Sequence, residues 1–304
     1  MRSLRRWIPV LLSLAFLAAT SPDTRPITDP KSIASDANPG AGAVPIDDLY
    51  FTRAVGFGPS WSPDGKEVVF STNLTGRSNL WKVASSGGWP IQLSQSDDRQ
   101  GSAVWSKDGK WIVYQSDRGG NETYDLYAIP GGGGTAVNLT NTPDISETGA
   151  RFSRDGRELL LSYKPKVSPV TDVAVMDWAS HTVRKLTNEQ TKDHIWQPVD
   201  WSPGGKVIYA NRANAGFTDA DIYRIDVASG ATEKLTEHQG NVRYSASSVS
   251  PDGRMLLISS DEKGGYQNVA LLDVASKKIT WVTDLQWEAE AGDFSPDGKC
   301  LTWW

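Results

Sequence analysis

The sequence predicts an all-β fold, a β-propeller of four-stranded blades with five complete blades and part of a sixth. A Ser-x-x-Gly turn motif recurs, and its last glycine falls at residues 65, 109, 156, 205, 253 and 298, a spacing of 44 to 49 residues. The segments that follow these turns are rich in β-branched and aromatic residues. Residues 57–304 show no sustained 3.6-residue periodicity, so an α-helical repeat is excluded.

Each repeat is predicted to form four strands in a fixed order. An aromatic or apolar residue followed by Ser ends the first strand, and Pro-Asp-Gly or a variant makes a tight turn because Gly accepts a positive φ. The second strand follows, as in residues 67–71 and 111–115, and then a polar loop such as 116–121. The third strand covers residues such as 125–129 and 221–226, and the fourth ends in Leu-Thr or a close variant. This order of short strands is typical of a propeller blade.

The unusual tryptophan content, 13 residues, is explained by the same repeat. Trp61, Trp105 and Trp201 share the position that ends the first strand, where Phe152 and Phe294 also occur. A single four-stranded sheet cannot bury both faces, and a large ring at this point fills the wedge between twisted blades. We therefore expect these aromatic side chains to form core and not to bind a ligand.

The sixth repeat supplies only two strands, over residues 291–304. In one interpretation residues 46–53 add a strand to this last blade and partly close a six-bladed ring. In the other, which we favour, the chain is the front part of a longer polypeptide, because the added strand still leaves the last blade with three strands. An unfinished blade predicts exposed apolar surface and a tendency to associate.

The N-terminal residues are typical of an export signal. Arg2, Arg5 and Arg6 precede an apolar run over 7–19, so we predict a signal peptide at 1–19, with an uncleaved anchor as the alternative. The apolar run is short for a bilayer, and no stable membrane insertion is expected. Residues 20–44 are predicted to form a flexible linker and 45–304 the propeller domain. The protein is then exported, periplasmic or secreted, in a bacterium.

Composition excludes several classes of function. The formal net charge of −5 leaves no basic surface for nucleic acid. The single cysteine, Cys300, excludes an internal disulfide and is expected to be a small buried residue. His181, His194 and His238 are far apart and show no metal-ligand spacing, and Asp219-Ala-Asp221 is interpreted as a surface turn. No metal and no cofactor are therefore expected.

The repeats resemble those of a known family. The Ser-Pro-Asp-Gly-Lys turns, the Ser-Asp-Arg-Gly-Gly loop at 116–120 and the Asp-Ile-Tyr third strand resemble the WD-type repeats of TolB propellers. Such repeats also form the N-terminal propeller of the prolyl oligopeptidase family, which includes dipeptidyl and acylaminoacyl peptidases. The segments 46–55 and 285–290 are similar to the opening and late blades of these peptidases. The resemblance covers about residues 45–304.

The resemblance implies a serine peptidase whose propeller gates peptide access to an α/β-hydrolase domain. The nucleophile of that domain lies in a Gly-x-Ser-x-Gly elbow, which these 304 residues lack, as they lack an alternating strand–helix pattern. We therefore predict no catalytic residue and no hydrolysis by this chain alone. The alternative is a periplasmic TolB-like scaffold with protein partners. A propeller lyase or lactonase is disfavoured, because it needs a metal cluster in the channel.

Five residues are candidates for binding at the central tunnel. His194 and Trp196 precede the Trp201 turn, and Trp287, Glu288 and Glu290 precede the Phe294 turn. Both segments lead into an innermost strand. In dipeptidyl peptidases propeller glutamates bind the substrate's amino terminus, but no matching motif surrounds these two glutamates. The alternative is solvated loop charge beside a packed Trp.

Overall fold

A computed structural model describes residues 54–56 and 58–304, and in this part of the chain every regular element is a β-strand. The predicted signal peptide at 1–19, the linker at 20–44 and the lead-in strand at 46–53 lie outside the described residues. No helix among the described residues has the length and apolar character needed to cross a membrane. The all-β prediction is confirmed.

The strands form five four-stranded antiparallel sheets and one two-stranded sheet in chain order. Blade 1 comprises β1 (Ser60–Trp61), β2 (Glu67–Thr72), β3 (Asn79–Ala84) and β4 (Ile91–Gln92). Blade 2 comprises β5 (Gln100–Trp105), β6 (Trp111–Ser116), β7 (Asp125–Pro130) and β8 (Val137–Asn138). Blade 3 comprises β9 (Ile145–Phe152), β10 (Glu158–Pro165), β11 (Asp172–Asp177) and β12 (Val183–Lys185).

Blade 4 comprises β13 (His194–Trp201), β14 (Val207–Asn214), β15 (Ala220–Asp226) and β16 (Thr232–Lys234). Blade 5 comprises β17 (Tyr244–Val249), β18 (Met255–Ser260), β19 (Asn268–Asp273) and β20 (Ile279–Trp281). The last sheet pairs β21 (Ala291–Phe294) with β22 (Leu301–Trp303). The predicted five blades and part of a sixth are therefore present.

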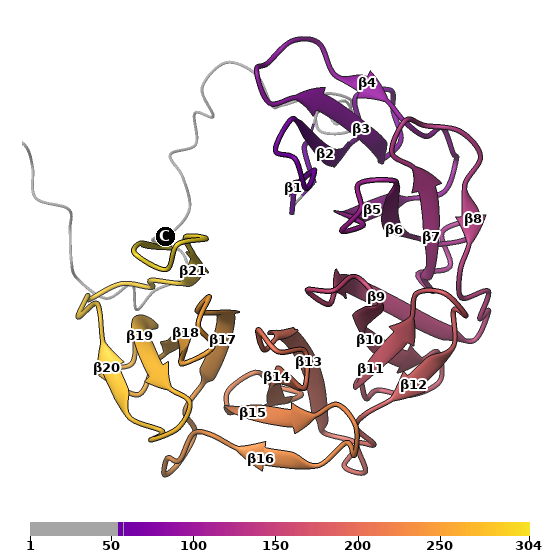
Figure 1. Cartoon of the computed structure of the whole chain (residues 1–304). Coiled ribbons are helices and arrows are strands. Elements are labelled where there is room, and N and C mark those ends of the chain that lie inside the picture. Colours follow the sequence, from indigo (N-terminus) through magenta and orange to yellow (C-terminus); the bar gives the residue numbers. More distant parts are fainter. Residues whose placement is uncertain (1–53, 57) are drawn as a thin grey trace, which may run out of the picture. The chain divides into compact units, whose positions relative to one another are not determined.

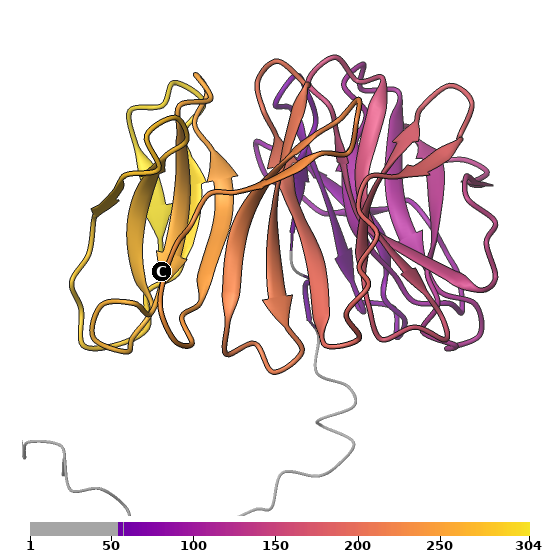
Figure 2. The same cartoon turned by 90° about the horizontal axis from the view of Figure 1, so that it is seen from below.

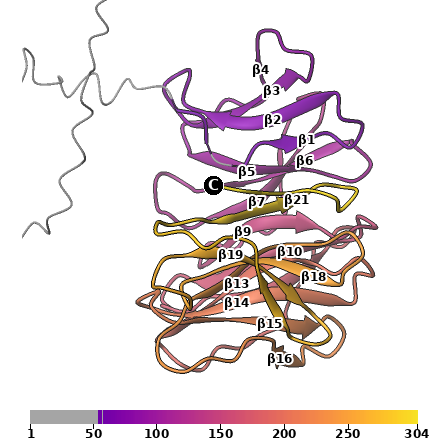
Figure 3. The same ribbon diagram turned by 90° about the vertical axis from the view of Figure 1, so that its left-hand side faces the viewer.

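The sheets follow one another around a common axis, with the first strand of each blade innermost and the fourth outermost (Figure 1). Seen from the side, the innermost strands run roughly along this axis (Figure 2). Figure 3 shows the molecule from the side on which β19 and β21 lie. This arrangement gathers the first strands, from blades far apart in sequence, around one central region.

The turn between the first and second strands is held by a repeated set of hydrogen bonds. In blade 3, Ser153 Oγ donates to Asp155 Oδ1 at 2.8 Å, and the backbone N of Glu158 donates back to Ser153 Oγ at 3.0 Å. Gly156 closes the turn with φ of 73°, a conformation that glycine adopts without strain. The same serine–aspartate bond recurs in blades 1, 2 and 5 and in the last sheet. Blade 4 has Gly204 in place of the aspartate.

The aromatic residue that ends each first strand packs against the preceding blade. Trp105 lies in one core cluster with Val69 and Leu80 of blade 1. Phe152 packs in the same way against blade 2 and Trp201 against blade 3, while Phe294 is partly buried against blade 5. The expected core role is confirmed for these residues.

Trp61 is an exception, and its expected core role is wrong. Its side chain is 60% exposed, because the position packs against a preceding blade and no blade precedes β1 in the described residues. The expectation for Cys300 is also wrong, since it is exposed. Cys300 lies in the turn before β22, where its backbone N donates to Ser295 Oγ at 2.9 Å.

Every innermost strand from blade 2 onward carries a register shift about two residues before the aromatic position. The shifts lie at 101–104 in β5, opposite Leu160–Ser162 in β9, at 198–200 in β13, at 246–248 in β17 and at 291–294 in β21. A β-bulge inserts an extra residue, bends the strand and increases its twist. The bulge therefore sets which side chains of the innermost strand face the axis.

A second repeated position joins the blades. Five residues before the aromatic position, each first strand or its lead-in from blade 2 onward has a buried residue: Gln100, Glu147, Trp196, Tyr244 and Ala289. At four of these positions the backbone N donates to a carbonyl that immediately precedes the third strand of the previous blade: Ser78, Tyr124, Thr171 and Gln267, at 2.8 to 2.9 Å. These bonds satisfy buried backbone groups and fix each blade against its neighbour.

Candidate functional site

The innermost strands of blades 3 to 5 and the last sheet line an open hollow near the axis, which we call the axial hollow. Its lining includes exposed polar side chains from four strands, together with the backbone of the bulges and the ring of Trp304. The polar members at its wall are Arg151, Gln197, Asn211, Ser245, Ser247 and Asp293. The hollow is the candidate functional site because chain segments from different blades converge there.

The bulges explain which residues line the hollow. Gln197 and Ser245 lie four residues before the aromatic position of their strands, and Arg151 and Asp293 lie one residue before it. In a regular strand these two positions would point to opposite faces, because side chains alternate. The extra residue of the bulge lies between the two positions, so their side chains point to the same face and both line the hollow.

The hollow is polar and carries both charges. Asn211 bridges blades 4 and 5, because its Nδ2 donates to Ser245 Oγ at 3.2 Å and its Oδ1 accepts from the Ala246 backbone at 2.9 Å. Arg151 and Asp293 are exposed charged groups. Beside the hollow, burial raises the pKa of Asp200, although the Arg151 guanidinium acts in the opposite direction. Such a lining suits an extended chain with polar backbone groups and a charged end.

His194 opens β13 and lies next to a hydroxyl and a carboxylate. Its Nδ1 is 3.2 Å from Thr191 Oγ1 and 2.9 Å from Asp193 Oδ1. Both contacts use the same ring nitrogen, so the group is no relay of the hydroxyl–imidazole–carboxylate kind, which needs one contact on each nitrogen. The geometry gives His194 no catalytic role, and its binding role stays a prediction.

Trp196 is only 6% exposed and belongs to the core between blades 3 and 4. Its ring packs edge-on against Tyr223, with ring centroids 4.9 Å apart. The Arg212 guanidinium lies 5.9 Å from the Trp196 ring and forms a 2.7 Å ion pair with Glu189. The indole therefore stabilises the blade junction and presents little surface to a ligand.

The three candidates before β21 differ in their surroundings. Trp287 is exposed, and Glu288 accepts a hydrogen bond from the Gln267 backbone at 2.9 Å, which ties it to blade 5. Glu290 is exposed and lies four residues before Phe294, the same repeat position as Gln197 and Ser245. A binding role for these residues stays a prediction, and Glu290 has the position that best suits it.

Sequence reasoning missed Arg151, Gln197, Asn211, Ser245 and Asp293. The signal was present in the repeat, since these positions hold polar residues between buried neighbours in several blades. Sequence reasoning assumed that side chains alternate strictly between the two faces of a strand. The bulge breaks this alternation, so the assumption places the residues on one side of the bulge on the wrong face.

A buried carboxylate occupies the junction between blades 2 and 3. Glu147 has no exposed surface, and Thr142 Oγ1 donates to it, 2.8 Å from Oε1 and 2.6 Å from Oε2. Burial raises the pKa of Glu147 to about 7, and the neighbouring Asp125 carboxylate adds to the rise. This acid titrates near neutral pH.

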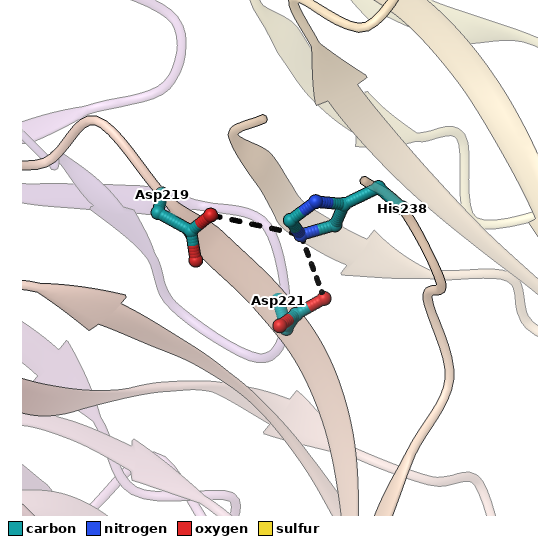
Figure 4. A group of neighbouring side chains, drawn as sticks. All are labelled: Asp219, Asp221 and His238. Carbon is teal, nitrogen blue, oxygen red and sulfur yellow. Dashed lines mark ion pairs between the residues drawn. The ribbon is translucent and has the colours of Figure 1, made fainter. Parts of the chain in front are cut away.

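One further cluster lies outside the axial hollow. Asp219, Asp221 and His238 bring their ligand atoms within 4.8 Å of one another at the junction of blades 4 and 5 (Figure 4). The sequence interpretation of Asp219–Asp221 as a surface turn does not describe Asp221, which lies in β15 with a mostly buried side chain. These residues have the atom types that bind divalent metals.

Comparisons with known proteins identify the repeats. The family profile described as TolB beta propeller domain matches residues 50–198, and the profile described as dipeptidyl peptidase IV N-terminal region matches residues 164–299. The dipeptidyl-peptidase 5 of Porphyromonas endodontalis is 28% identical over 291 residues, covering 77% of this chain and 41% of the relative. That of Porphyromonas gingivalis is 24% identical, covering 94% of this chain and 42% of the relative. The chain thus spans about two fifths of the length of these bacterial relatives.

A TolB protein of Francisella tularensis is 22% identical, over 60% of this chain and 51% of the relative. Among solved structures, a putative TolB from Agrobacterium tumefaciens matches with a TM-score of 0.55 and 20% identity, covering 77% of this chain and 82% of that one. A prolyl endopeptidase structure matches with a TM-score of 0.62 and 15% identity, covering 81% of this chain and 38% of that one. These structures share the propeller fold. The chain is a β-propeller whose repeats are similar to the TolB propeller domain over residues 50–198 and to the dipeptidyl peptidase IV N-terminal region over residues 164–299.

Proposed function

We propose that this chain is the propeller region of an exported bacterial serine peptidase, and that it gates peptide access to a hydrolase domain outside these 304 residues. The observation that supports this most is the match of residues 164–299 to the dipeptidyl peptidase IV N-terminal region. This segment contains β13 to β21, whose side chains form most of the axial hollow.

The gate acts by shape and by charge. A hollow lined by innermost strands receives an extended peptide more readily than a folded domain. Amide and hydroxyl groups such as Gln197 and Ser245 can pair with peptide backbone groups. The carboxylate of Asp293 at the wall of the hollow, and that of Glu290 in the segment before β21, attract the positive amino terminus of a short peptide.

A periplasmic TolB-like scaffold is the second candidate. One observation favours it: the TolB beta propeller domain profile matches residues 50–198. In this function the propeller surface binds partner proteins, and no hydrolase domain is involved.

The coding sequence that follows codon 304 separates the two functions. The peptidase predicts a downstream Gly-x-Ser-x-Gly with Asp and His after it in chain order, and the protein encoded by the whole gene should cleave chromogenic dipeptide substrates. The 304-residue chain alone should give no turnover above a mock purification. A stop codon after one further blade, without this elbow, would overturn the peptidase in favour of the scaffold.

The gate itself is tested in the protein encoded by the whole gene. Glu290→Gln should lower kcat/KM for dipeptide substrates by about tenfold, the effect of losing one charged hydrogen bond. The matched control is Glu122→Gln, an exposed glutamate in the loop between β6 and β7. Equal kcat/KM in the two variants and the unmodified protein would exclude Glu290 from the gate.

A further inference from the structure

The cluster of Asp219, Asp221 and His238 lies between two blades, with one residue in the loop before β15, one in β15 and one in the connection from β16 to β17 (Figure 4). The His238 side chain is 6% exposed, and its Nε2 is buried without a hydrogen bond. The atoms that Nε2 faces are Asp221 Oδ1 at 3.3 Å and Asp219 Oδ2 at 3.9 Å.

The other nitrogen of the imidazole fixes its tautomer. Nδ1 lies 3.1 Å from the carbonyl oxygen of Gly240, which can only accept, so Nδ1 carries the proton. In a neutral imidazole Nε2 then presents a lone pair toward two carboxylate oxygens, and it has no hydrogen-bond partner among the described residues. A ring N–H bound to a backbone carbonyl is also how metal-binding histidines are usually oriented.

Comparison with the other blades shows that this arrangement is specific to blade 4. In each other blade, the residue two positions after the Leu-Thr pair or its variant donates its backbone N to the Asp or Asn at the start of the third strand. Examples are Thr142 to Asp125 and Glu189 to Asp172, at 2.9 and 2.8 Å. In blade 4 the His238 imidazole takes this place beside Asp221, and Asp219 adds a second acid that the other blades lack at its position.

The ion pair and hydrogen bond that Asp221 shares with the corresponding residue of blade 3 leave a lone pair of its Oδ1 free to bind a cation. Lys234 Nζ pairs with Oδ2 at 2.7 Å, as Lys185 pairs with Asp172 in blade 3. Thr236 donates to Oδ1 at 2.8 Å, as Thr187 does to Asp172. Oδ1 keeps a second lone pair on the side of Nε2, so it can accept a cation there while the repeated bonds remain.

We propose that Asp219, Asp221 and His238 bind a divalent transition-metal cation, with Zn²⁺ as the expected ion. Imidazole nitrogen and carboxylate oxygen are both zinc ligand atoms, and three protein ligands leave a fourth position for water. Ligand atoms of a tetrahedral zinc site lie about 3.3 Å apart, since each is about 2.0 Å from the metal. The two carboxylate oxygens lie 3.3 and 3.9 Å from Nε2, and all three ligand atoms lie within 4.8 Å of one another, so metal binding requires Asp219, whose side chain is 29% exposed, to move inward. The bound ion ties the connection between β16 and β17 to the start of β15.

The test is a titration of the metal-free 304-residue protein with Zn²⁺, followed by calorimetry. We expect one Zn²⁺ per chain, with affinity at least tenfold weaker in His238→Asn and in Asp219→Asn. Co²⁺ serves as a spectroscopic probe, because binding in a site of low coordination gives visible absorption bands that His238→Asn should abolish. Asp219→Asn alters no hydrogen bond of the repeated motif, so it remains informative if His238→Asn fails to fold.

The matched control is His181→Asn, a surface histidine with φ of 58° that asparagine accommodates well. It should bind Zn²⁺ as the unmodified protein does. Equal affinity in Asp219→Asn would overturn the site. Lack of Zn²⁺ binding by the unmodified protein, with both His238 nitrogens protonated at neutral pH in NMR spectra, would show that the cluster is a simple ion pair.

Discussion

In the Ser-x-Asp-Gly turn, the aspartate side chain forms the hydrogen bonds that hold the turn between the first and second strands. In five of the six turns a serine hydroxyl donates to the aspartate, as Ser62 does to Asp64, and this bond lowers the pKa of the carboxyl. The aspartate also accepts from the backbone two residues later, which closes the turn. Blade 4 lacks these two bonds because it has Gly204, although Ser202 Oγ still accepts from the Val207 backbone at 3.1 Å.

We expect Gly204→Asp to stabilise the protein by about 1 kcal/mol. A Cβ at Gly204 meets no atom within 4 Å, and its φ is not in the left-handed region, so the new side chain fits without strain. The gain combines the Ser202 hydrogen bond with lower backbone entropy of the unfolded chain. Urea unfolding measures it, and Gly132→Asp, equally unhindered but without a serine two residues earlier, is the control. A gain no larger than that of the control would contradict the hydrogen-bond contribution.

Glu147 predicts the pH dependence of stability. Its pKa of about 7 in the folded protein is above the ordinary value of 4.5, so the folded state binds this proton more tightly than the unfolded chain. This group therefore favours folding more as the pH falls from about 7 to 4.5, and it costs stability above pH 7. Glu147→Gln keeps the shape and removes the charge, so it should stabilise the protein at pH 8 by on the order of 3 kcal/mol and have little effect at pH 4.5.

Free energies of unfolding at these two pH values check the Glu147 prediction. Glu122→Gln, at an exposed site, is the control and should change neither value. A destabilised Glu147→Gln at pH 8 would mean that the charged carboxylate makes favourable interactions that outweigh its burial.

At the level of strands, the sequence predicts most of the architecture. The expected second strand at 111–115 is β6 (Trp111–Ser116), and the expected third strand at 125–129 is β7 (Asp125–Pro130). The agreement arises because the same turn residues recur in each blade, so the ends of the corresponding strands can be predicted from several repeats. The bulges have no such signal, because an extra residue in a strand changes the facing of side chains without changing their identity.

The candidate site could be predicted only in part for the same reason. Sequence reasoning located the segments that lead into β13 and β21, but it chose Trp196, which the strand turns into the blade junction. Gln197, the next residue, lines the axial hollow. The cluster of Asp221 and His238 depends on the hairpin of β15 and β16, which brings residues 17 positions apart together. The same hairpin places Glu189 beside Asp172 in blade 3, where the contact is a backbone hydrogen bond.

The whole molecule depends on packing between consecutive blades, and this makes Trp61 informative. In the 304-residue chain its ring occupies the inter-blade position but is 60% exposed, and such an apolar ring favours association. We expect the mass measured by light scattering to rise with protein concentration, and Trp61→Ser to weaken association by about tenfold, since burying an indole is worth at least about 1.5 kcal/mol. Trp89→Ser is the control, because Trp89 is 82% exposed in the loop between β3 and β4, away from the inter-blade position. A monomer at every concentration, or an equal effect of the two substitutions, would show that the Trp61 face does not drive association.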